Sequence, residues 1–263
     1  MSRLHLSFAC GSLTLAGTLD TAPGKTGLLI VSGGNDPRAG AFSGQARLAN
    51  AVARTGFPVF RFDRRGVGDS EGENRGFRKS SRDIASAREA LLALAPDVER
   101  VVAFGNCDAA SALMLTGGEG FDGLILSNPW TLEEAADETA TLPPSAVRER
   151  YAAKLKNPRE IGRLLSGGVN LKKLARGLIQ ATASEDSSTG GLADEMRAGL
   201  EGFDGWVSIL LASADRTAQA FAQRWPSDDD RVQNCEGAGH AFVEPDHRAW
   251  LEKRILEGLR AQR

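Results

Sequence analysis

The chain has few of the residues that mark several functional classes. Its 263 residues include 3 cysteines and 3 histidines, and the cysteines are too far apart for a disulfide framework or a metal motif. The formal net charge is only −2, which gives no basis for binding nucleic acid or an anionic membrane. No apolar run approaches the roughly 20 residues that span a bilayer, and we expect no signal peptide. We therefore expect a cytoplasmic protein without membrane insertion, whose oligomeric state the sequence leaves open.

Apolar segments alternate with helical patterns through the first half of the chain. The apolar segments are continuous rather than alternating, which is typical of parallel strands buried on both faces. An N-terminal hairpin is expected over residues 4–19. Further strands are predicted at 27–31, 57–62, 100–104 and 123–127, with helices at 43–54, 80–94 and 108–116. The sequence thus predicts an α/β fold with a mostly parallel central sheet and helices on both faces.

The pattern changes after residue 130. Residues 131–202 have a charged, helical pattern with little strand character, and strands are predicted again at 206–211 and 230–235 before a final helix at 245–259. We therefore predict a core of residues 1–130 and 203–263. The insertion, 131–202, is predicted to be a helical lid over a pocket; a purely structural helical layer is the alternative.

The most informative segment joins the strand at 100–104 to the following helix. Gly105, Cys107 and Ala109 place one nucleophile between two small residues, where a strand and a helix must approach closely. The start of a helix also favours a thiolate. The segment resembles the nucleophile elbow of the α/β-hydrolase superfamily, with cysteine in place of the usual serine. A buried cysteine at the end of a core strand is the alternative interpretation.

A cysteine nucleophile needs a base and an acid, which in this fold follow it in the order acid, then histidine. His240 follows the last predicted strand in a glycine-rich loop, whereas His5 lies upstream and His247 lies in the final helix. Asp215 follows the preceding strand, where it could also cap a helix. The predicted triad is therefore Cys107, His240 and Asp215.

An oxyanion hole should lie beside this triad. One donor is predicted to be the backbone N–H of Asp108. The other is predicted at Gly34, with Asn35 as the alternative, because the loop after the 27–31 strand is rich in glycine. The helix start favours a thiolate at Cys107, but the neighbouring Asp108 carboxylate could have the opposite effect and raise the pKa of that thiol. Substrate contacts are suggested for two further residues, Arg38 and Trp130.

The resemblance to α/β hydrolases extends over nearly the whole chain. It also rests on the Asp-x-Arg-Gly-x-Gly-x-Ser pattern at 63–70. The Gly-Asn-Cys-Asp-Ala-Ala-Ser elbow and the Ser-Gly-Gly-Asn-Asp-Pro-Arg loop more narrowly resemble the type 1 exosortase A system-associated hydrolases. Those are bacterial proteins encoded beside exopolysaccharide and protein-sorting machinery. Dienelactone hydrolases and polyhydroxyalkanoate synthases similarly use cysteine on this fold.

The predicted fold and triad are compatible with three alternative functions. The first is hydrolysis of an ester, thioester or lactone through a covalent acyl-enzyme, with a small-molecule acyl substrate and no metal or organic cofactor. The second is acyl transfer to a sugar hydroxyl or another acceptor by the same triad. The third is a non-catalytic binding or scaffolding role, because a fold does not guarantee an activity.

Overall fold

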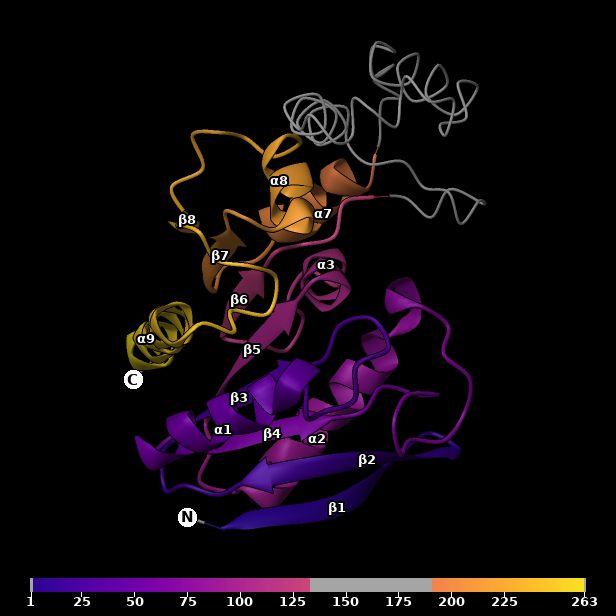
Figure 1. Cartoon of the computed structure of the whole chain (residues 1–263). Coiled ribbons are helices and arrows are strands. Elements are labelled where there is room, and N and C mark those ends of the chain that lie inside the picture. Colours follow the sequence, from indigo (N-terminus) through magenta and orange to yellow (C-terminus); the bar gives the residue numbers. More distant parts are fainter. Residues whose placement is uncertain (1, 133–190, 263) are drawn as a thin grey trace, which may run out of the picture. The chain divides into compact units, whose positions relative to one another are not determined.

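The computed structural model describes residues 2–132 and 191–262. The chain divides into two units, residues 1–131 with 192–263, and residues 132–191, and the fold described here is that of the first. Within the described residues, eight strands form one sheet in the order β1-β2-β4-β3-β5-β6-β7-β8 (Figure 1). The first two strands pair antiparallel with their neighbours, and the strands from β4 to β8 are parallel. The predicted fold class is confirmed.

The elements follow the predicted alternation of strand and helix closely. The strands are β1 (Arg3–Cys10), β2 (Leu13–Asp20), β3 (Thr26–Val31), β4 (Val59–Phe62), β5 (Arg100–Asn106), β6 (Gly123–Ser127), β7 (Trp206–Ala212) and β8 (Val232–Cys235). The helices are α1 (Gly44–Arg54), α2 (Ser81–Leu94), α3 (Asp108–Leu115), α7 (Leu192–Glu201), α8 (Arg216–Ala222) and α9 (Pro245–Ala261), with short 3-10 turns η1 (Ala41–Ser43) and η2 (Phe77–Lys79).

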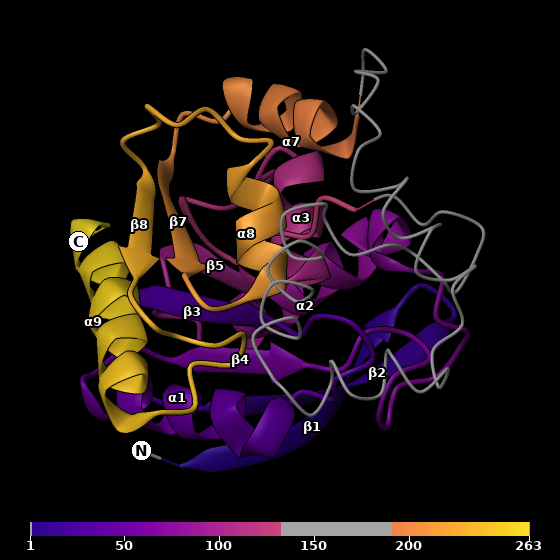
Figure 2. The ribbon, with the colours of Figure 1, turned by 45° about the horizontal axis from the view of Figure 1, so that its top comes forward.

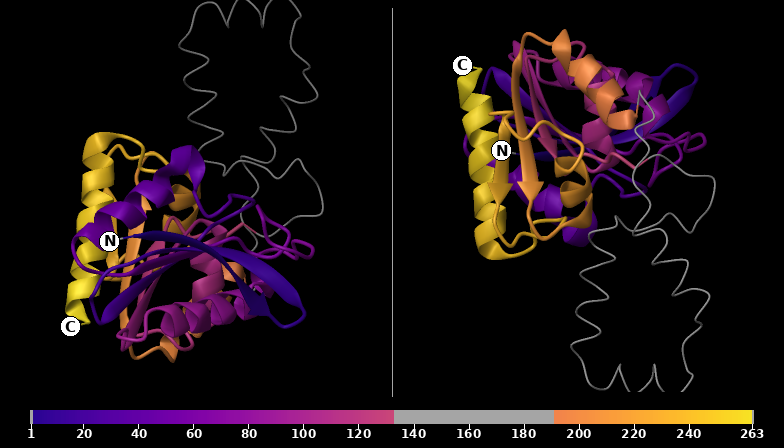
Figure 3. Two further views of the ribbon diagram at one scale, coloured as in Figure 1. Left: turned by 90° about the horizontal axis from the view of Figure 1, so that it is seen from below. Right: turned by 90° about the horizontal axis from the view of Figure 1, so that it is seen from above.

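Two apolar layers cover the sheet, one on each face. Side chains of α1 and α9 pack on one face, and Figures 2 and 3 show these two helices on the same side. The helices α2, α3, α7 and α8 pack on the other face. The central strands are therefore buried on both sides, which explains why they are continuously apolar.

The insertion ends earlier than predicted. Helix α7 falls within the predicted range 131–202, yet Leu192, Met196 and Leu200 are buried in the same apolar layer as α3. A side chain at Gly199 would collide with the carbonyl of Met114, so the two helices approach closely there. The last turns of the predicted lid thus belong to the core. The helices predicted between 132 and 182 lie outside the described residues.

Candidate active site

Cys107 occupies a sharp turn between β5 and α3. Its backbone has φ 62° and ψ −129°, a conformation that costs energy for a residue with a side chain. A Cβ on Gly105 would lie 2.8 Å from the Ala109 carbonyl carbon and the Ala110 nitrogen. This contact explains why the elbow requires a small residue two positions before the cysteine. The half-buried thiol therefore stands at a strained strand-to-helix turn.

His240 and Asp215 meet beside this turn. The Nδ1 atom of His240 lies 2.9 Å from Oδ2 of Asp215. Cys107 is close enough to His240 to raise the pKa of the imidazole. The same Asp215 oxygen accepts a hydrogen bond of 3.1 Å from the backbone N–H of Ala218, so Asp215 also caps α8. The other histidines lie elsewhere, His5 on β1 and His247 in α9. The structure thus brings together the three residues predicted for the triad.

The contacts of His240 strongly favour its protonated form. The hydrogen bond to Asp215, followed by the interaction with Cys107, raises the pKa of His240 to about 10. Burial alone would raise the pKa of Asp215, but the hydrogen bond from His240 and those from backbone N–H groups together lower it. At neutral pH the pair is therefore an imidazolium facing a carboxylate.

The loop after β3 lies directly against the elbow. A Cβ on Gly33 would lie 3.3 Å from the Cβ of Cys107 and would collide with the carbonyl of Asn106. The N–H of Gly34 donates a hydrogen bond of 2.7 Å to Oδ1 of Asp108. The N–H of Gly34, one predicted oxyanion donor, is therefore bonded to the side chain of Asp108, whose own N–H is the other predicted donor. The backbone N–H of Asp108 begins α3, where helical N–H groups have no carbonyl partner within the helix.

Arg64 forms hydrogen bonds with both Gly34 and Asp108. Its Nη2 donates to the carbonyl of Gly34 at 2.5 Å and to both carboxylate oxygens of Asp108 at 3.3 Å, and the residue is only 4% exposed. The Asp108 carboxylate is thus directed toward the loop and Arg64. The side chain of Asn35, the alternative donor, accepts a hydrogen bond of 2.7 Å from Asn74.

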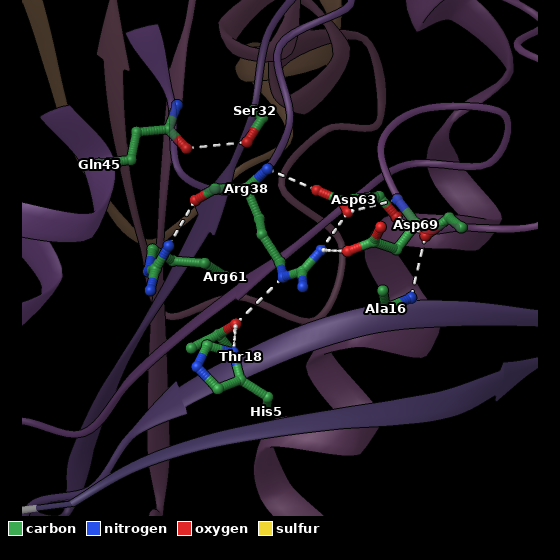
Figure 4. Close-up of polar contacts among 10 residues, drawn as sticks. His5, Ala16, Thr18, Ser32, Arg38, Gln45, Arg61, Asp63 and Asp69 are labelled. Atoms are coloured by element: carbon green, nitrogen blue, oxygen red, sulfur yellow. Dashed lines mark hydrogen bonds and ion pairs between the residues drawn. The ribbon is translucent and has the colours of Figure 1, made fainter. Parts of the chain in front are cut away.

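Arg38 joins the loop after β3 to the segment at 63–70. Its guanidinium donates to the carboxylates of Asp63 and Asp69 and to the hydroxyl of Thr18 (Figure 4). Asp63 is fully buried and also accepts from the backbone N–H of Arg38. These contacts anchor the loop after β3 to the segment at 63–70. The contact predicted between Arg38 and a substrate anion stays a prediction.

Trp130 lies next to the elbow. Its backbone N–H donates to the carbonyl of Cys107 at 3.4 Å, and its backbone carbonyl accepts a hydrogen bond of 2.7 Å from the hydroxyl of Ser111. The half-buried side chain packs against the core layer that contains α3. Its predicted contact with substrate stays a prediction.

Asn128 is a site residue that the sequence reasoning missed. It is fully buried with φ 43°, and its Nδ2 donates to Asn106 Oδ1 at 3.0 Å and to the carbonyl of His240 at 3.2 Å. Its Oδ1 accepts from the N–H of Ala212 at 2.8 Å. Asn128 therefore fixes the loop that carries His240. The available signal was a polar residue directly after a buried strand.

We expect Asn128→Ala to lower both the free energy of unfolding and the turnover number. Losing these hydrogen bonds and leaving their partners buried should cost about 2–4 kcal/mol, because each buried unpaired group costs about 1–3 kcal/mol. Asn128→Gly is the matched control, since glycine tolerates the positive φ but also lacks the amide. Denaturant unfolding compares them. Equal stability of all three proteins would contradict this role for the amide.

The sequence also matches a known protein family. The Alpha/beta hydrolase family model matches residues 28–254. The chain belongs to the α/β-hydrolase family. No curated protein matches the sequence significantly.

Solved structures of other α/β hydrolases share this fold at low sequence identity. The α/β hydrolase GrgF from Penicillium sp. sh18 is 15% identical with a TM-score of 0.65, covering 99% of both chains. The esterase Pf2001 of Pyrococcus furiosus is 14% identical with a TM-score of 0.64, covering 99% of this chain and 91% of its own. A thioesterase domain from the curacin biosynthetic pathway is 14% identical with a TM-score of 0.59, covering 97% of this chain and all of its own.

No helix within residues 2–132 and 191–262 is long and apolar enough to cross a membrane. In the same part of the chain, no group of three or more histidine, cysteine, aspartate or glutamate residues is arranged to hold a metal ion.

Proposed function

We propose that this α/β hydrolase cleaves an ester, thioester or lactone through a covalent acyl-enzyme on Cys107. The observation that carries the proposal is the His240–Asp215 pair beside the strained turn that holds Cys107. Thiols attack carbonyl carbons readily and also leave readily, so activated acyl bonds suit this nucleophile better than amides do.

In the acylation step, the thiolate of Cys107 attacks the carbonyl carbon and the carbonyl π electrons move to oxygen. The tetrahedral intermediate collapses, the bond to the leaving oxygen or sulfur breaks, and that atom takes the proton from Nε2 of His240. His240 is then neutral and accepts a proton from water, which attacks the thioester and releases the acid and the thiolate. Asp215 holds the imidazole in one orientation throughout.

The oxyanion would be stabilised by backbone N–H groups. The N–H of Asp108 starts α3 beside the thiol, where the helix dipole also favours negative charge. The N–H of Gly34 becomes a second donor once the Asp108 carboxylate releases it. In the resting enzyme that carboxylate occupies the donor that the substrate oxygen would use.

The sequences of the elbow and of the loop after β3 also suggest the biological system in which the protein acts. Their resemblance to type 1 exosortase A system-associated hydrolases favours a bacterial protein acting near exopolysaccharide export or protein sorting. Its substrate would then be a small acylated molecule of that machinery.

Intact-protein mass spectrometry during reaction with a panel of activated esters and thioesters tests the proposal. We expect an adduct with the mass of the acyl group that decays in water. Decay that is slow in water and fast with an added sugar would indicate acyl transfer instead. Neither adduct nor turnover with any panel member, together with a Cys107 inert to iodoacetamide, would indicate a binding protein.

A further inference from the structure

A cavity of about 450 Å³ lies between α1 and α9, directly beside His240. Its wall includes His240 and Asn106 from the elbow side and Asp36 from the loop after β3. The cavity is thus continuous with the proposed active site but reaches it from the side of the base rather than of the nucleophile. Ligand sites of small molecules commonly have volumes of roughly 300–1,000 Å³.

The lining of the cavity is mostly apolar, with the amide side chains of Gln45 and Asn106 among its polar members. The apolar side chains come from α1, β5 and the segment around α9, namely Leu48, Ala51, Phe104, Phe242 and Leu251. Such a wall offers few partners to the hydroxyl groups of a sugar, and buried hydroxyls without partners are costly. The lining therefore favours an apolar occupant.

The charges of the lining side chains largely cancel. Two acids, Asp36 and Glu252, accompany two bases, Arg47 and Arg248, and all except Glu252 are exposed. The imidazolium of His240, which also lines the cavity, is already paired with the carboxylate of Asp215. Equal numbers of both signs give no preference for an anion or a cation. The occupant is therefore expected to be uncharged.

Two exposed apolar side chains belong to the lining or follow a lining residue in sequence. Phe42, adjacent to the lining residue Ala41, is 75% exposed, and the lining residue Val243 is 44% exposed. Phe42 also has a φ of 52°, which is unfavourable for an aromatic residue and is followed by a second positive φ at Ser43. Exposed apolar side chains beside an apolar cavity mark a contact surface better than scattered ones do.

The chemistry of His240 indicates which part of a substrate belongs here. The imidazole gives its proton to the leaving group during acylation, so the leaving atom must come within hydrogen-bond reach of this ring. The acyl group, in contrast, stays bonded to Cys107, which does not line the cavity. A space walled by the base therefore suits the departing alcohol or thiol.

We propose that the cavity between α1 and α9 binds the leaving group of the substrate, an uncharged apolar alcohol or thiol. The inference rests on the proposed acyl-enzyme mechanism. In it, the carbon–oxygen or carbon–sulfur bond breaks, the electron pair stays on the leaving atom, and His240 supplies its proton. The apolar remainder of that alcohol or thiol lies against Leu48, Ala51 and Phe242.

The test compares leaving groups at a constant acyl group. Ala51→Trp on α1 and Ala249→Trp on α9 each place an indole in the cavity, and both positions are outside the triad. Ala85→Trp is the control, because Ala85 is exposed on α2, which covers the opposite face of the sheet. The substrates are the methyl thioester and the 2-naphthyl thioester of butyric acid, and then the naphthyl thioesters of acetic and octanoic acid.

We expect each cavity variant to lower kcat/KM for the naphthyl butyryl thioester by about tenfold or more, the size of effect that pocket shape produces. The value for the methyl thioester should change by less than about twofold. The rate of butyryl-enzyme decay should be unchanged, because both substrates form the same acyl-enzyme.

Two results would overturn the proposal. If the variants instead alter the preference among acetyl, butyryl and octanoyl groups, the cavity holds the acyl chain. If they alter neither preference while Ala85→Trp behaves as wild type, the cavity is not part of the substrate site. Failure of the mechanism itself is distinguishable, since wild-type protein would then form no butyryl adduct.

Discussion

Replacing Cys107 by alanine is expected to remove the acyl-enzyme and to lower kcat/KM by roughly 10⁴-fold or more, the scale seen when a covalent nucleophile is deleted. The physical reason is that no other thiol can replace it, because Cys10 and Cys235 are buried. Burial, followed by the nearby Glu236, also raises the pKa of the Cys235 thiol. Steady-state hydrolysis of an activated thioester measures the loss.

The matched control is a Cys10→Ala/Cys235→Ala double variant, which retains only Cys107. It should keep the adduct and most of the activity, whereas Cys107→Ser should keep the fold and lose sensitivity to iodoacetamide. Full turnover by Cys107→Ala would show that another group is the nucleophile.

Replacing Asp215 by asparagine should lower kcat by roughly 10³–10⁴-fold with little change in KM, because the imidazole loses the carboxylate that orients it. The same change removes the largest contribution to the raised pKa of His240. In the wild-type protein, NMR titration should place the pKa of His240 near 10, and in Asp215→Asn it should fall toward the ordinary value of 6.5. His5 and His247 serve as internal references, with His240→Gln for assignment.

The raised pKa also predicts how stability depends on pH. His240 binds its proton more tightly in the folded protein than in the unfolded chain, so its contribution to folding is fully present below about pH 6.5 and is lost as pH rises to about 10. Asp215→Asn should therefore flatten the stability profile across that range. A wild-type His240 pKa close to 6.5, or an unchanged pKa in the variant, would contradict the ion pair.

The fold was predictable because burial on both faces leaves a direct mark on the sequence. Strands such as β3 and β5 are continuously apolar, and the helices between them show helical periodicity. The elbow was recognisable because Gly105 cannot carry a side chain against α3. Asp215 and His240 followed from their positions after the strands β7 and β8, where the fold brings loop residues together.

The polar contacts around the site were not predictable, because they join residues far apart in sequence. Nothing near Arg38 indicates that its guanidinium meets Asp63 and Thr18. Likewise, the glycine-rich loop predicts a close backbone approach but not that Asp108 takes the N–H of Gly34. These hydrogen bonds depend on the orientation of each side chain, which the sequence pattern does not specify.

The sequence by itself determined the alternation of strands and helices, the tight turn at Cys107 and the loops that carry Asp215 and His240, since local periodicity and small-residue spacing encode these features. Only the tertiary structure decided that Arg38 anchors a loop, that Asn128 holds the His240 segment, and that α1 and α9 enclose a cavity beside the base. The reason is that hydrogen bonding and packing of these residues are fixed by elements that meet only after the sheet has formed.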